Sequence, residues 1–157
     1  MTDYFQNFSF VVPCSHGVAA KLVRAINDEI ENIVDWFDSD EAEGDDPPPS
    51  AIFDTQTLDW APSVYVVADP DGLWFSSPDG SEDIDRTVEA VRWVLDQPGI
   101  EVEWVIFQWG NSASRPILDA YGGGVVLVSK DETRWMNTGK IASDWEQEMK
   151  EKRHEAD

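Results

Sequence analysis

The chain has 157 residues, of which 41% are hydrophobic, and its 32 Asp and Glu against 11 Lys and Arg give a formal net charge of −21. This length favours one domain of about 100–200 residues, which can fold without disulfides or a structural metal. Eight Trp and seven Phe exclude a disordered acidic tail, because such tails are poor in aromatics. The charge opposes direct binding to nucleic acid or to an anionic membrane, both of which attract basic surfaces.

The expected compartment is the cytoplasm. The only cysteine, Cys14, excludes an internal disulfide framework. The first residues lack the basic and then apolar pattern of a secretory signal, and no window approaches the roughly 18 apolar residues of a membrane helix.

The N-terminal part predicts a strand followed by a long helix. Alternating apolar residues predict a strand over residues 5–12, and Ser15 is placed to cap a helix running from His16 to Phe37. The apolar residues of that helix recur every three or four positions and form one stripe. Its opposite face carries four carboxylates spaced by three, four and three residues, namely Asp28, Glu31, Asp35 and Asp38.

An acidic, proline-rich segment over about residues 38–50 is expected to be an exposed loop that continues this line of charge. We call the combined surface the acidic stretch. Its carboxylates are Asp28, Glu31, Asp35, Asp38, Asp40, Glu41, Glu43, Asp45 and Asp46. Trp36 lies among them, and an aromatic ring beside carboxylates suits a partner rich in arginine.

The remaining chain predicts strands over 51–57, 63–69 and 73–77, a helix over about 81–97, strands over 101–109, 125–129 and 133–137, and a charged helix over 141–153. The strand over 101–109 is apolar on both faces, which is typical of a central strand covered on both sides. The order β-α-β-β-β-α-β-β-β-α predicts a single α+β domain, with a mixed, mostly antiparallel sheet and about three helices.

Two groups of tryptophans are expected. Trp93, Trp104 and Trp145 fit apolar stripes and are predicted to lie in the core. Four others stand beside acidic or turn segments and are predicted to be partly exposed, namely Trp36, Trp60, Trp74 and Trp109.

No motif predicts a catalytic residue, a cofactor or a metal site. A Cys14-Ser15-His16 cluster at the start of a helix is the first place to look for a nucleophile, but neighbours in sequence need not form a catalytic pair. The Asp-rich runs lack the spacing of a calcium loop, and Cys and His are too few for zinc. A structural cysteine is therefore expected.

In general character the acidic stretch resembles that of the small phage and plasmid proteins that block restriction or CRISPR systems by imitating the DNA phosphate backbone. The resemblance implies a non-enzymatic inhibitor whose anionic surface occupies the cationic site of a nucleic-acid-binding enzyme. Three alternatives stay open: an antitoxin or immunity protein against a basic nuclease, a small enzyme, and a housekeeping protein adapted to high salt.

Overall fold

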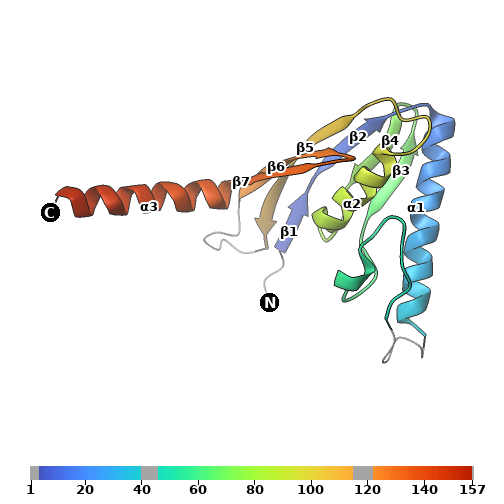
Figure 1. Cartoon of the computed structure of the whole chain (residues 1–157), viewed down its shortest axis with the longest axis horizontal. Helices are drawn as coiled ribbons and strands as arrows, with labels where there is room; N and C mark the ends of the chain where they lie inside the picture. The colour runs from blue at the N-terminus through green and yellow to red at the C-terminus, as the bar shows by residue number, and fades with distance from the viewer. Residues whose placement is uncertain (1–3, 40–45, 115–121, 157) are drawn as a thin grey trace.

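The computed structural model describes residues 4–39, 46–114 and 122–156, which form an α+β domain with two antiparallel sheets (Figure 1). The first sheet has the order β1-β5-β6-β7, made of β1 (Tyr4–Asn7), β5 (Trp104–Ala113), β6 (Gly122–Ser129) and β7 (Thr133–Asn137). The second has the order β2-β4-β3, made of β2 (Ser9–Pro13), β4 (Gly72–Ser76) and β3 (Tyr65–Asp69). The helices are α1 (His16–Phe37), α2 (Ile84–Leu95) and α3 (Thr138–Ala156).

The predicted fold class and the three helices are confirmed. Helix α1 begins and ends at the predicted residues, and the Ser15 hydroxyl caps it by accepting the Val18 N–H at 3.3 Å. Helix α2 is capped by Asp83, whose carboxylate accepts the N–H groups of Asp85 and Arg86.

The strand predicted over residues 5–12 is divided at Phe8. The Ser77 hydroxyl accepts the Phe8 N–H at 2.8 Å, and the Ser77 N–H donates to the Phe8 carbonyl at 3.1 Å. Since Ser77 occupies both backbone groups of Phe8, β1 pairs with β5 and β2 pairs with β4. The expected single sheet is therefore two sheets.

The strand predicted over residues 51–57 is wrong. The Ser50 hydroxyl accepts the N–H groups of Ile52 and Phe53 at 3.1 and 3.0 Å, and a 3-10 turn follows over Thr55–Thr57. Such local side-chain bonds replace the strand ladder for these backbone groups.

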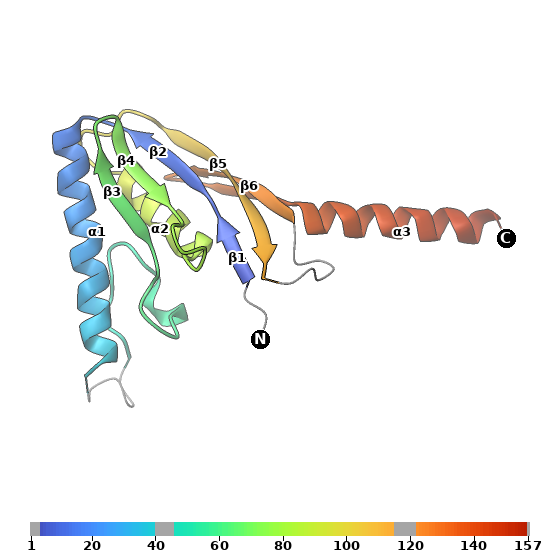
Figure 2. The ribbon, with the colours of Figure 1, turned by 180° about the vertical axis from the view of Figure 1, so that it is seen from behind.

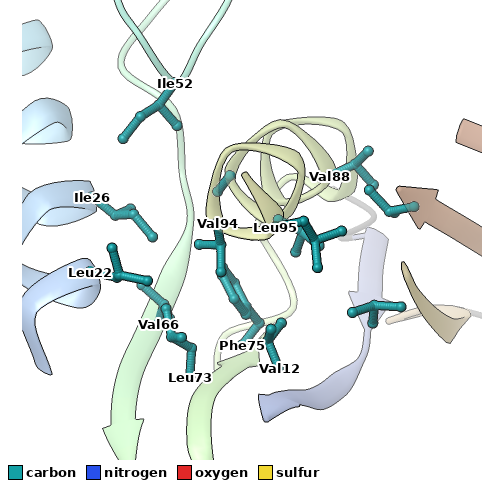
Figure 3. Packing of buried hydrophobic residues seen from close by; sticks show 14 of the residues in the cluster. Val12, Leu22, Ile26, Ile52, Val66, Leu73, Phe75, Val88, Val94 and Leu95 are labelled. Atoms are coloured by element: carbon teal, nitrogen blue, oxygen red, sulfur yellow. The ribbon is translucent and has the colours of Figure 1, made fainter. Parts of the chain in front are cut away.

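Helices α1 and α2 supply much of the core. Helix α1 packs on β3 and β4, while α2 lies against β6 (Figures 1 and 2). Figure 3 shows Val94 of α2 beside Phe75 of β4, and Leu22 and Ile26 of α1 pointing toward the same cluster. All four side chains are buried, and Ile26, Phe75 and Val94 have no exposed surface. Burying apolar side chains of this size stabilises the fold by about 1.5–3 kcal/mol each.

A stack of aromatic rings joins the two sheets. Phe10 of β2 lies between Phe75 of β4 and Phe107 of β5, with ring centroids 5.3 and 4.0 Å away and interplanar angles of 9° and 11°. Phe8 also approaches Phe107, at 5.9 Å. Aromatic pairs of this kind contribute about 0.5–1.5 kcal/mol beyond the area that they bury.

The tryptophan predictions are only partly confirmed. Trp93 packs against the core as expected. Trp104 and Trp145 are 57% and 66% exposed, so their predicted core positions are wrong. Strand β5 is central, but the face that carries Trp104 is uncovered by any described element, and α3 extends away from the sheets (Figure 2). The expectation that Trp36, Trp60, Trp74 and Trp109 are partly exposed is confirmed.

Removing the central ring of β5 tests the junction of the sheets. Phe107→Ala should lower the free energy of unfolding by about 3–5 kcal/mol, because it leaves a cavity beside Phe8 and Phe10. Urea unfolding followed by tryptophan fluorescence measures the change. Phe5→Ala, at a half-buried position outside the core cluster, is the matched control and should lower the free energy of unfolding by less. Equal losses would contradict the role of the aromatic stack.

Candidate anionic interface

The four α1 carboxylates of the acidic stretch lie in the solvent. Asp28, Glu31, Asp35 and the C-cap residue Asp38 are all exposed. The apolar stripe of α1 faces the core, and these carboxylates lie on the opposite side of the helix. Asp46 is also exposed. The other predicted residues, Asp40, Glu41, Glu43 and Asp45, lie outside the described residues.

Among the described residues, none of these carboxylates forms an ion pair. Within the described residues, the ion pairs join Arg86 to Asp83 and Glu89, Arg134 to Glu132, Lys140 to Asp144, and Lys150 to Glu146. None of them includes a carboxylate of α1. Arg24 lies one helical turn before Asp28, whereas from Glu31 to Asp38 the face carries like charges three or four residues apart.

The charged residues of α1 are arranged unfavourably for the helix dipole, which favours acids at the N-terminus and bases at the C-terminus. Its first turn has no acidic residue and its last turn has no basic one, while Asp35 and the C-cap Asp38 lie at the negative end of the helix dipole. Helix α2 has the opposite, favourable arrangement, with Asp85 in its first turn and Arg92 in its last. The acids of α1 thus reduce the stability of the helix that carries them.

An aromatic cluster adjoins this end of α1. Trp36 is half-buried and meets Phe37 edge to face at 4.9 Å, and Phe37 lies 5.3 Å from the ring of Trp60. Trp60 is 58% exposed. The pattern along α1 identified Trp36, but only the tertiary contact with Phe37 brings Trp60 to the same site. Exposed indole beside carboxylates suits a guanidinium, which can pair with the acid and stack on the ring.

The Cys14-Ser15-His16 cluster is not arranged as an activated thiol. Burial raises the pKa of the half-buried Cys14 thiol, and a backbone hydrogen bond from Leu73 lowers it by a smaller amount. The Ser15 hydroxyl caps α1, and Nδ1 of His16 lies 3.3 Å from the Asp69 carbonyl oxygen. A catalytic thiol needs the opposite shift of its pKa.

Some acidic side chains outside α1 have a structural role. A surface hollow of about 510 Å³ includes Glu89, Arg92 and Asp96. Glu89 in this hollow accepts the Asp54 N–H at 2.7 Å and pairs with Arg86.

In the described part of the chain, no group of three His, Cys, Asp or Glu is placed to hold a metal ion. No described helix is long and apolar enough to cross a membrane.

Comparison with protein-family models, with curated proteins and with solved structures finds no match to this chain. The site is therefore interpreted from its own geometry and charge.

Neutralising acids at the end of α1 should stabilise the free protein. We expect Asp35→Asn with Asp38→Asn to raise the free energy of unfolding by about 0.3–1 kcal/mol in total at low salt, because repulsion and the unfavourable dipole contact are relieved. Thermal unfolding followed by circular dichroism measures it. Asp85→Asn, in the first turn of α2, is the matched control and should lower stability. A loss of stability in the α1 variant would contradict the electrostatic account.

The Cys14 thiol should react slowly. Because its pKa is raised, less thiolate is present at neutral pH than for an ordinary cysteine, and the rate should climb only at higher pH. Alkylation of the folded protein by iodoacetamide, followed by mass spectrometry, gives the rate against that of the urea-unfolded chain. Faster alkylation of the folded protein at neutral pH would indicate an activated nucleophile.

Proposed function

We propose that this protein is a non-enzymatic inhibitor whose acidic stretch occupies the cationic nucleic-acid-binding site of an enzyme. The α1 carboxylates would take the positions of backbone phosphates, with the exposed Trp60 and the half-buried Trp36 at the end of the helix receiving arginine side chains. Electrostatic attraction between the two surfaces would speed their encounter and orient them.

One observation carries this proposal: a line of exposed carboxylates without described cationic partners that runs to the helix end where acids are least favourable. An acidic surface serving only solubility would have no reason to concentrate charge where it costs stability. The same protein places its acids and bases favourably on α2, so the arrangement on α1 is not a general property of its helices.

Charge alone does not account for the arrangement of side chains. The rings of Trp36, Phe37 and Trp60 form a connected group beside the acids, and Trp60 leaves more than half of its surface in water. Arg-rich grooves that hold nucleic acid offer both a charge for the carboxylates and a flat guanidinium for the rings. The cluster therefore favours an Arg-rich protein partner over a diffuse cloud of counterions.

The test is retention of a partner from a bacterial lysate. Immobilised wild-type protein should retain a nucleic-acid-binding enzyme at low salt and release it at high salt, since the contact is electrostatic. Duplex DNA or RNA should compete for the retained enzyme, and the free inhibitor should block its binding to nucleic acid. A retained nuclease toxin would instead identify the antitoxin alternative.

A matched pair of variants localises the surface. The variant with Asp28→Asn, Glu31→Gln, Asp35→Asn and Asp38→Asn should lose at least about tenfold in affinity and show a weaker dependence on salt. The control neutralises four exposed acids on other elements, Asp71→Asn, Asp79→Asn, Glu101→Gln and Asp131→Asn, for the same change of net charge. Equal affinities for the two variants would reject α1 as the binding surface.

A further inference from the structure

The sheets have a second face that no described helix covers. Cross-strand pairing in β5, β6 and β7 places Ile106 opposite Leu127, and Val125 opposite Met136, on the side away from α1 and α2. Trp104 lies two residues before Ile106 and shares this side. Trp104, Ile106 and Met136 are 57%, 50% and 56% exposed. We call this surface, made of Trp104, Ile106, Val125, Leu127 and Met136, the outer face. The exposed Gln108 and Arg134 share it, opposite Val125 and Leu127.

The outer face continues onto the second sheet. Val11 and Pro13 of β2 share a hollow of about 440 Å³ with Trp104 and Ile106. Val11 pairs with Trp74 of β4, and both side chains are more than one third exposed. A large and mostly apolar exposed surface on a charged protein marks a contact site.

Helix α3 carries an apolar stripe that its own chain leaves mostly in water. Ile141, Trp145 and Met149 follow one another at intervals of four residues, and the last two are 66% and 63% exposed. Only Ile141 is half-buried among the α3 residues whose burial the structure describes. Pairs such as Lys140 with Asp144 and Glu146 with Lys150 add only about 0.2–0.5 kcal/mol each. A helix without packing is marginal in water, so α3 needs a surface to lie on.

That surface is not the sheet of its own chain. Helix α3 starts at the residue after β7 ends and points away from both sheets (Figures 1 and 2). Its start is held in place: the Thr138 hydroxyl bonds the Gly123 N–H and carbonyl at 3.0 and 3.2 Å, and the Asn137 side chain accepts the Lys140 N–H at 2.7 Å. Gly122, at a φ of +133°, lets Thr138 approach, since a Cβ there would lie 2.4 Å from the Thr138 hydroxyl oxygen. No turn is available to fold the helix back.

The exposed area fits a dimer. The chain exposes 10242 Å², about 2,000 Å² more than the roughly 8,000 Å² of a compact monomer of its mass. Obligate homodimers bury about 2,000–5,000 Å² in total, which is about 1,000–2,500 Å² from each copy. Helix α3 is about 28 Å long by its 19 residues, close to the roughly 27 Å of the eight-residue strand β6, so one helix can span the outer face.

The low net charge of α3 also favours its contact with a second copy of the chain. Helix α3 has four basic and five acidic residues, so it is nearly neutral in a chain of net charge −21. It can approach the outer face of an identical chain without bringing the two acidic stretches into contact. Since each chain offers both a helix and an outer face, two copies can form the same contact twice and close a twofold dimer.

We propose that the protein forms a twofold homodimer in which α3 of each copy lies across the outer face of the other. Ile141, Trp145 and Met149 of one copy pack on Trp104, Ile106, Leu127 and Met136 of its partner. The α1 carboxylates stay free in this dimer, so it presents two acidic stretches. The dimer does not depend on the inhibitor function and is tested separately.

Sedimentation velocity on the full chain over a range of concentrations tests the dimer. Wild type should be dimeric, while Trp145→Glu and Ile106→Glu should each weaken the dimer at least about tenfold, because a charge then enters the apolar contact. Ser143→Glu adds the same charge to the opposite side of α3 and should stay dimeric. All three sites are exposed, and circular dichroism confirms folding. A mixture of the two variants should form a heterodimer. In it, the wild-type α3 of the Ile106→Glu chain packs on the wild-type outer face of the Trp145→Glu chain.

Three outcomes would overturn the dimer: a monomeric wild type, a dimer that both glutamate variants leave intact, or a loss with Trp145→Glu but not with Ile106→Glu. The last would place the contact between helices alone. Added salt should strengthen the dimer by screening the repulsion of two acidic bodies, whereas it should weaken capture of a basic enzyme. Failure of one proposal is therefore distinguishable from failure of the other.

Discussion

The stacking of Phe10 between Phe75 and Phe107 is the contact on which the rest of the structure depends. Phe10 belongs to the sheet of β2, β4 and β3, and Phe107 belongs to the sheet of β1, β5, β6 and β7. The two sheets meet through these rings because Ser77 interrupts the first strand at Phe8 and sends its halves to different partners. Helices α1 and α2 then close the core from one side.

Covering only one side of the sheets divides the surface into two unlike regions. Helix α1, packed on β3 and β4, presents its carboxylates to water, whereas the opposite side of β5 to β7 presents Trp104, Ile106 and Met136. The first region suits a cationic partner and the second an apolar one. The separation keeps the exposed side chains of the outer face apart from the acids of α1, whereas the exposed Trp60 lies with the acids.

Sequence periodicity was sufficient for the elements set by local contacts. Helix α1, its Ser15 cap and its acidic face follow from the spacing of residues along one helix, and β7 was predicted at its observed bounds. The break at Phe8 required a hydrogen bond to Ser77, 69 residues away, so no local pattern could reveal it. Likewise Trp60 joins the aromatic cluster only through Phe37. For Trp104 and Trp145 the apolar spacing predicts a buried face, but spacing alone cannot tell whether that face is covered by its own chain or left open.

The attachment of α3 to β6 has a mechanical consequence. Two hydrogen bonds between Thr138 and Gly123 fix the direction of a helix that the described part of the body contacts only near its start. Because the helix is attached at this end alone, a small change of angle at Thr138 displaces its far end, near Arg153, by a much larger distance. A side chain at Gly123 or Gly124 would collide with the backbone of Trp109 or of Met136, so the direction of this arm is tied to the packing of the sheet itself.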